Sequence, residues 1–203
     1  MAATSTKIFV LEVMGRHAGW IAAAGALAAE HRGDAPQLVV LPEVAFNQEA
    51  FLQRVAMSVD QFGFCALVVS EGARYADGTF LADSGQRDVF GHAQLGGVAP
   101  VVAQMIEREL GYKHHWAVAD YLQRSARHIA SATDLDHAYK LGEAAVELAL
   151  QGHNAVMPII RRLSDEPYRW DIDHVPLADV ANVERTLPAE FISADGFGIT
   201  DAC

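Results

Sequence analysis

Apolar residues gather in short, nearly uninterrupted runs that are separated by longer stretches of mixed character. Four runs of this kind occur, at 8–14, 37–41, 64–70 and 114–120. Each has the length and composition of a strand that is buried on both faces of a parallel sheet. The intervening and following stretches favour helices, which we expect at 20–30, 47–61, 98–110 and 134–150. Strands that alternate with helices predict an α/β fold class, a Rossmann-like three-layer sandwich with a mostly parallel sheet.

Several residues near the predicted helix ends have capping preferences. Asn47 suits the N-cap of the second helix, and Asp134 suits the N-cap of the last one. Gly152 follows the end of that last helix, where glycine is common. A further apolar segment, 155–160, comes next and has the character of a strand.

Polar residues with binding chemistry stand directly after the predicted strands. Gly15 and Arg16 follow the first strand and precede a helix, a turn that suits an anion such as phosphate. An ordinary strand-to-helix turn is an equally good interpretation of this glycine and arginine. Glu71 follows the third strand, and Tyr121 and Arg124 follow the fourth. Ligands of open α/β sheets bind beyond the carboxyl ends of the strands, so we expect these residues to converge on a small anionic, hydroxyl-rich ligand.

A long loop over 72–97 separates the third strand from its helix. Loops of this length inside a compact domain are usually functional or mobile. We expect either a lid or interface flap, or a surface insertion.

Composition excludes several classes of partner. The formal net charge of −11 argues against a nucleic-acid surface, and no apolar run is long enough to predict a membrane span. The two cysteines, Cys65 and Cys203, do not make a disulfide framework and fit a reducing compartment. The histidines lack the spacing of a metal site, so no metal ligands are predicted. We therefore expect a cytoplasmic protein without nucleic-acid or membrane partners.

Three short segments together carry a family resemblance. Glu12-Val-Met-Gly-Arg-His-Ala-Gly19, Ser70-Glu-Gly72 and Tyr121-Leu-Gln-Arg-Ser-Ala-Arg-His128 resemble the phosphofructokinase family, and most closely its diphosphate-dependent branch. The similarity runs from Lys7 to the 195–200 segment. It implies one lobe of a two-lobed fold, with a glycolytic phosphotransferase activity that moves phosphate from diphosphate to the 1-hydroxyl of fructose 6-phosphate.

The resemblance also implies roles for individual residues. The Met14-Gly15-Arg16 turn would hold fructose 6-phosphate, and Arg16 would also stabilise charge on the transferred phosphoryl group. Glu71 would bind sugar hydroxyls, and Tyr121 with Arg124 would bind the sugar phosphate. Lys7 would reach the substrate of a neighbouring subunit, which implies a homo-oligomer. A second cross-subunit residue is expected among Lys113, His114 and His115, and the sequence does not decide between them.

The family's donor-binding motifs do not occur in these 203 residues. The glycine-rich phosphate loop, the acidic Mg²⁺ site and the Thr-Ile-Asp element with its catalytic base are all missing from them. We therefore expect a fragment, with an acceptor lobe over 1–124 and a segment over 125–203 that crosses toward the donor lobe and returns. The apolar faces of 134–150 and 155–160 should then be exposed. A catalytically inactive sugar-phosphate-binding fragment, or part of an ATP-dependent 6-phosphofructokinase, are the alternatives.

Overall fold

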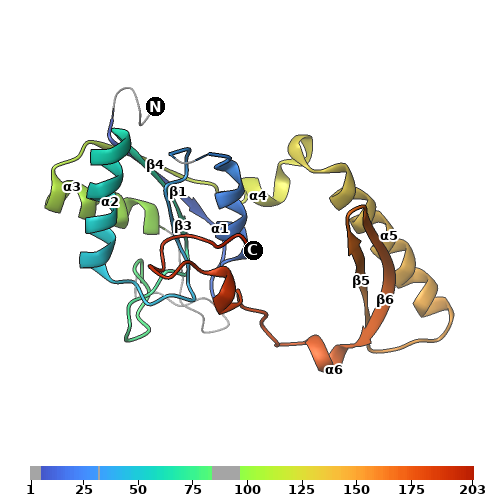
Figure 1. Ribbon diagram of the computed structural model, residues 1–203. Helices are drawn as coiled ribbons and strands as arrows, with labels where there is room; N and C mark the ends of the chain where they lie inside the picture. Colours follow the sequence, from blue (N-terminus) through green and yellow to red (C-terminus); the bar gives the residue numbers. More distant parts are fainter. Residues whose placement is uncertain (1–5, 32, 84–96) are drawn as a thin grey trace. The chain divides into compact units, whose positions relative to one another are not determined.

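The chain forms two compact units in the computed structural model, which describes residues 6–31, 33–83 and 97–203 (Figure 1). Unit 1 comprises Met1–Gln123 and Arg185–Cys203, and unit 2 comprises Arg124–Glu184. The chain therefore leaves unit 1 once and returns to it for its last residues. Among the described residues, no helix combines the length and the apolar character needed to cross a bilayer.

Unit 1 is built on a four-stranded parallel sheet. Its strands, in spatial order, are β2 (Leu38–Val40), β3 (Cys65–Ser70), β1 (Ile8–Val13) and β4 (His114–Val118). The central strand β1 pairs with β3 from Ile8 opposite Cys65 and with β4 from Ile8 opposite His114. The carboxyl ends of β1, β3 and β4 consequently lie at one edge of the sheet, where the predicted polar residues follow them.

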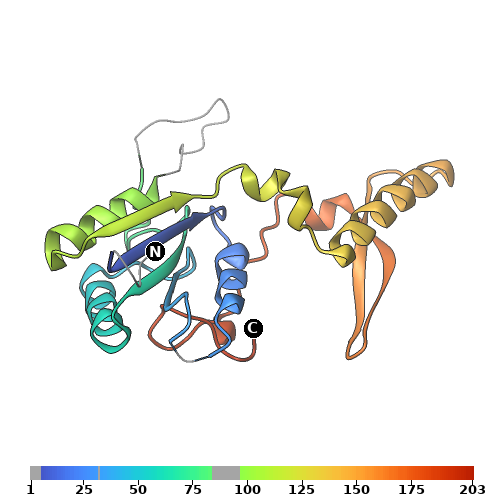
Figure 2. The same ribbon diagram turned by 90° about the horizontal axis from the view of Figure 1, so that it is seen from above.

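Helices cover both faces of this sheet (Figure 1 and Figure 2). The short helix α1 (Trp20–Gly25) lies on one face, and α2 (Gln48–Phe62) and α3 (Val98–Leu110) lie on the other. Each face has its own apolar cluster, one around Phe51, Leu67 and Ile106 and a smaller one around Ala22 and Val68. The structure thus confirms the predicted three-layer sandwich with a mostly parallel sheet.

The helices of unit 1 follow their sequence signals closely, with one exception. Asn47 caps α2 as predicted, because its side chain accepts a hydrogen bond from the backbone N–H of Ala50. The first helix is shorter than the predicted 20–30 and tightens at Gly25 into a 3₁₀ turn, Ala26–Ala28. Glycine weakens a helix interior, and α1 buries only Ala22 and Ala23, so little packing energy holds a longer helix here.

The last residues of the chain pack onto unit 1. Phe197 joins the core beside Phe51, and its carbonyl accepts a hydrogen bond from Val39 of β2. A 3₁₀ turn at Ala189–Phe191 lies nearby in sequence. The indole N–H of Trp20 donates to the carbonyl oxygen of Arg185 at 2.8 Å, so α1 holds the point at which the chain re-enters the unit.

Unit 2 contains one long helix and one hairpin. Helix α5 (Ala132–Leu150) packs against the antiparallel strands β5 (Val156–Asp165) and β6 (Tyr168–Pro176). The shorter elements are α4 (Leu122–Ser125), which spans the boundary between the units, the 3₁₀ turn Arg127–Ile129, and α6 (Leu177–Val180).

Two details of unit 2 differ from the sequence expectation. Ser131 rather than Asp134 caps α5, because the Ser131 hydroxyl accepts from the N–H of Asp134 at 3.0 Å. A hydroxyl three residues before an N–H has the geometry of an N-cap, which the Asp134 side chain inside the first turn lacks. The apolar segment 155–160 is the first part of a longer hairpin whose second strand was not predicted.

Unit 2 contributes no residue to the buried core. None of the buried hydrophobic residues falls within 124–184, and Tyr139, Val146 and Leu150 of α5 are exposed. The exposed apolar surface expected for this part of the chain is therefore present. Half of the predicted lid over 72–97, residues 84–96, lies outside the described residues; the described stretch 72–83 contains a bridge between Arg74 and Phe80.

Candidate functional site

The turn after β1 is held against the turn after β3. The N–H of Gly15 donates to the Glu71 carboxylate at 3.2 Å, and the carbonyl of Gly15 accepts from the N–H of Gly72 at 3.0 Å and from the Ser70 hydroxyl. A Cβ atom at Gly72 would lie 1.9 Å from the carbonyl oxygen of Arg16. Only glycine lets the two backbones approach so closely, and this approach fixes Glu71 beside the Met14–Arg16 turn.

Glu12 occupies the next wall of the site. It stands inside β1, only 2% of it is exposed, and both of its carboxylate oxygens are hydrogen bonded. One oxygen accepts from the N–H of Gly97 at 3.1 Å and the other from the N–H of Ala99 at 2.8 Å. These amides belong to the N-cap residue and the first turn of α3, so Glu12 ties the central strand to that helix.

The turn after β4 forms the third wall. Asp120 has a positive φ of 43°, a conformation that aspartate adopts more readily than most residues. The amide side chain of Gln123 links this turn to the one after β1. It donates to the carbonyl of Asp120 at 3.3 Å and accepts from the N–H of Met14 at 3.4 Å.

A cavity of about 370 Å³ opens between these three turns. Three of its lining residues are acidic, namely Glu12, Glu71 and Asp120. The lining residues are Glu12, Val13, Met14, Glu71, Gly97, Val118 and Asp120. Its volume suits a small ligand, and carboxylate oxygens are acceptors for hydroxyl groups. The cavity wall contains no cationic side chain among the described residues, so the cavity suits the hydroxyl-bearing part of a ligand better than a phosphate.

The cavity brings together only some of the residues predicted for the site. Met14 and Glu71 line it, whereas Gly15 and Arg16 form the adjoining turn without lining it. Tyr121 follows Asp120 directly and is 68% exposed. Arg124 is the first residue of unit 2 and is described with that unit.

Lys7 lies far from this cavity. It precedes β1, whose carboxyl end bears the cavity, and the six residues of that strand span about 20 Å. Its ammonium group donates to the carbonyl of Gly63 at 3.0 Å. Lys113 is beside it, because its carbonyl accepts from the backbone N–H of Lys7. Lys7 therefore does not contribute to the cavity at the other end of its own strand.

Three residues of the site were not among the predicted ones. Glu12 carries a sequence signal that could have found it, a lone charge inside a buried apolar strand. Asp120 stands at a strand end like Glu71, and the same rule would have included it. Gln123 gives no comparable signal, because its role depends on the distance between two turns.

The site offers nothing that resembles a metal centre. Among the described residues, no group of three or more His, Cys, Asp or Glu side chains is placed to hold a metal ion. Both carboxylate oxygens of Glu12 are taken by backbone amides. The donor set among the described residues therefore does not fit Mg²⁺.

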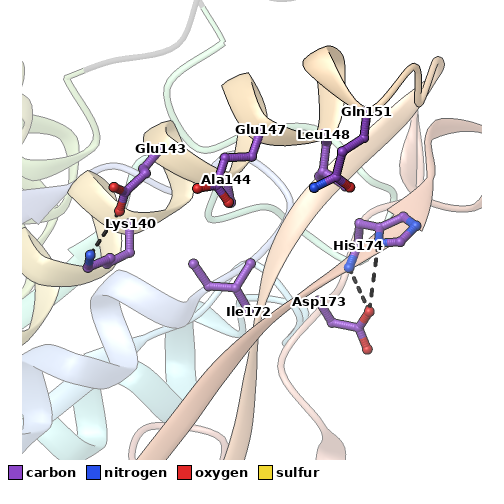
Figure 3. A pocket seen from close by; sticks show the side chains of 9 residues that line it. All are labelled: Lys140, Glu143, Ala144, Glu147, Leu148, Gln151, Ile172, Asp173 and His174. Atoms are coloured by element: carbon purple, nitrogen blue, oxygen red, sulfur yellow. Dashed lines mark hydrogen bonds and ion pairs between the residues drawn. The ribbon is translucent and has the colours of Figure 1, made fainter.

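A second cavity, of about 360 Å³, lies within unit 2 between α5 and β6 (Figure 3). On its wall, the Lys140 ammonium lies 2.8 Å from the Glu143 carboxylate, and His174 stands beside Asp173. Ala144, Leu148 and Ile172 supply its apolar wall. None of the residues predicted for the site lines this cavity, so the cavity at the sheet edge is the candidate functional site.

A three-layer α/β unit with a polar cavity at the carboxyl ends of its parallel strands defines a class of proteins that bind small polar ligands. The comparison with known families is more specific. The phosphofructokinase family matches residues 1–149, and the chain belongs to this family.

Individual relatives are diphosphate-dependent enzymes by name. The chain is 66% identical over 203 residues to the pyrophosphate–fructose 6-phosphate 1-phosphotransferase of Halomonas elongata, and 64% identical to that of Methylococcus capsulatus. The whole chain takes part in both matches, which cover 48% of each relative. The chain thus spans about half the length of the curated relatives it matches.

Two solved structures of pyrophosphate-dependent phosphofructokinases are also similar to this chain over its whole length. The crystal structure of the pyrophosphate-dependent phosphofructokinase from Marinobacter aquaeolei matches with a TM-score of 0.85 and 51% identity, over 100% of this chain and 47% of that one. The enzyme from Nitrosospira multiformis matches with a TM-score of 0.86 and 54% identity, over the same shares.

Proposed function

We propose that this chain carries the fructose 6-phosphate site of a diphosphate-dependent phosphofructokinase. The observation that carries the proposal is the cavity at the ends of β1, β3 and β4, which is lined by Met14 and Glu71 of the family motifs. The names of the relatives supply the substrates, since they are called pyrophosphate–fructose 6-phosphate 1-phosphotransferases. Glu71 is already oriented by Gly15 and so can accept from sugar hydroxyls without rearrangement.

The remaining binding residues meet the phosphate of the sugar. Arg16, Tyr121 and Arg124 offer donors that match phosphate oxygens, and two of them are arginines, whose planar fork binds phosphate with two parallel hydrogen bonds. These local donors are needed because the protein as a whole has a formal net charge of −11 and repels an anionic substrate. Lys7 is assigned to the substrate of a neighbouring subunit in a homo-oligomer.

In the proposed reaction, the 1-hydroxyl oxygen of the sugar forms a bond to a phosphorus atom of diphosphate. The bond from that phosphorus to the bridging oxygen breaks, so that phosphate leaves and fructose 1,6-bisphosphate forms. The hydroxyl proton goes to the family's catalytic aspartate, whose Thr-Ile-Asp motif these 203 residues do not contain. Arg16, beside the site, would stabilise the negative charge on the transferred group.

The setting of this activity is also part of the proposal. Diphosphate is the expected donor, and ATP is the alternative that some members of the family use by name. Magnesium, when bound with the donor, would neutralise part of the diphosphate charge. We place the enzyme in the cytoplasm, in glycolysis.

Calorimetric titration with fructose 6-phosphate and with fructose tests the binding part of this proposal. Selective binding of the phosphate ester is expected, because the arginines recognise the phosphate. Equal binding of both sugars would reject the phosphate assignment. A folded full-length protein that binds fructose 6-phosphate but transfers no phosphate from diphosphate would point to a binding protein without this activity.

Replacement of Arg16 tests the catalytic part. In the full-length protein, Arg16→Ala should lower kcat by about 10²–10³-fold and raise KM much less, because its main contribution is to the transition state. Arg108→Ala, on an exposed arginine of α3 paired with Glu109, is the matched control. An unchanged kcat in Arg16→Ala would remove its role in the transition state.

A further inference from the structure

Helix α3 begins without a cap of its own. Its N-cap residue is Gly97, which has no side chain, and its first turn contains no acidic residue. The first amides of a helix have no partner within the helix, and the helix dipole makes this end attractive to anions. Gly97 also lines the cavity. An uncovered positive helix end would therefore face the bound ligand and offer a place for phosphate.

Glu12, which is distant in sequence, occupies the N-terminal amides of α3. It is 85 positions away from Gly97 in sequence, and its carboxylate accepts from Gly97 and Ala99 with both oxygens. The side chain is 98% inaccessible, so its charge is held in place by these two amides alone among the described residues. The cavity wall that could have bound phosphate is thereby occupied by a fixed carboxylate.

We propose that Glu12 is a specificity-determining residue, which sets the orientation of the substrate by occupying the anion-binding end of α3. With this end taken, the α3 amides cannot bind a phosphate, and the other acidic residues that line the cavity, Glu71 and Asp120, disfavour an anion there. The hydroxyls of the sugar enter the cavity, and the phosphate of the sugar remains outside it. This inference rests on the proposed function for the identity of the sugar. The binding of phosphate to the N-terminal end of α3 does not depend on that function.

The test removes the carboxylate from the full-length protein. In Glu12→Ala, the α3 amides become free to bind inorganic phosphate, and calorimetry should detect one more phosphate per chain than in the wild type. Inorganic phosphate should also compete with fructose 6-phosphate about tenfold more strongly, as a regained helix-end anion site would allow. KM for fructose 6-phosphate should rise more than kcat falls. A loss of rigidity alone would lower stability and kcat without adding a phosphate site.

A matched control comes from the other helix on the same face of the sheet. Glu49 stands in the first turn of α2, is exposed, and does not line the cavity. Glu49→Ala removes the same charge and should leave the number of bound phosphates and the inhibition by phosphate unchanged. An identical gain of phosphate in Glu49→Ala would show that net charge rather than the α3 end is responsible, and would overturn the inference.

Glu12→Gln keeps the experiment decisive if the alanine variant fails to fold. Glutamine fills the same space and retains one acceptor, but it carries no charge and cannot serve both amides. Phosphate affinity should then rise by about threefold, a smaller gain than in the alanine variant. A folded Glu12→Gln protein with unchanged phosphate affinity would overturn the inference. Because phosphate binding is measured directly, this outcome is separate from any failure of the proposed transferase activity.

Discussion

Three carboxylates of the cavity have different surroundings, and these suit them to different tasks. Glu12 is buried and saturated by two amides, so it serves as a fixed part of the wall. Glu71 is held by a single amide, which leaves acceptor capacity for a ligand. Asp120 is exposed on the turn after β4 and faces the same space. The same chemical group thus supplies rigidity in one place and recognition in the others.

Replacement of Arg124 tests the phosphate assignment at a single residue. Arg124→Ala in the full-length protein should weaken binding of fructose 6-phosphate by about 1.5–3 kcal/mol, the contribution of a charge-assisted hydrogen bond. Binding of fructose should not change, because fructose has no phosphate. Calorimetry with both sugars measures the difference, and equal weakening for the two would contradict the assignment.

The buried thiol predicts a dependence of stability on pH. Burial in β3 raises the pKa of Cys65 from 9.0 to about 11. The unfolded chain therefore releases this proton at a lower pH than the folded one. The resulting contribution is fully present below pH 9 and is lost as the pH rises through about 11, for a total of about 2–3 kcal/mol.

Urea unfolding of the wild type and of Cys65→Ala measures this contribution. The difference in unfolding free energy between the two proteins should narrow between pH 8 and pH 10.5, since alanine cannot titrate. Cys203→Ala is the control, because Cys203 is exposed. A constant difference between the wild type and Cys65→Ala over this range would refute the prediction.

At the scale of elements, backbone contacts hold the turn after β1 and the turn after β3 together. Their contact depends on Gly15 and Gly72, and a Cβ at Gly72 would collide with the backbone of Arg16 and Gly15. The site is therefore shaped by backbone contacts that tolerate no larger residue.

Gly72→Ala should accordingly destabilise the protein by about 2–3 kcal/mol and abolish sugar-phosphate binding, because the turn must move. Gly78→Ala provides the comparison. Gly78 has a positive φ of 84° but no atom within 4 Å of a built Cβ, so its substitution should cost about 1 kcal/mol of backbone strain and leave binding intact. Thermal unfolding and calorimetry together measure both effects; similar losses in the two variants would argue against the steric explanation.

Local sequence patterns predicted most elements because strand and helix periodicity is a local property. The bounds of α3 match the prediction fully, and the cap of α2 is the predicted residue. The strand β6 was missed although Tyr168, Trp170 and Ile172 alternate with charged residues, which is a strand signal. In the site, Glu71 could be predicted because it directly follows a strand, whereas Met14 was expected from the family resemblance. The pairing of Glu12 with α3 could not, because it depends on how two distant segments pack.

At the scale of the whole chain, the core is unevenly distributed. The buried hydrophobic residues all belong to unit 1, whereas unit 2 consists of a helix and a hairpin with exposed apolar side chains. A two-stranded hairpin with one helix buries little surface and has little stability of its own. The two units should therefore differ in how readily they open.

Amide hydrogen exchange of this 203-residue chain should show the difference. The amides of β1 and β3, which are central in the sheet, should exchange slowest, and those of α5, β5 and β6 should exchange at least about tenfold faster. Mass spectrometry of peptic fragments gives the required resolution. Equal protection in the two units would show that unit 2 is stabilised by more than the contacts seen within it.

The hydrogen bond between the Trp20 indole and the carbonyl of Arg185 has a practical consequence. The chain has three tryptophans, and the other two, Trp116 and Trp170, lie in β4 and β6. A protein with Phe at positions 116 and 170 would keep a single tryptophan, at the place where the returning segment docks. Its emission would shift to the red when residues 185–203 detach, which would make Trp20 an intrinsic optical reporter of that docking.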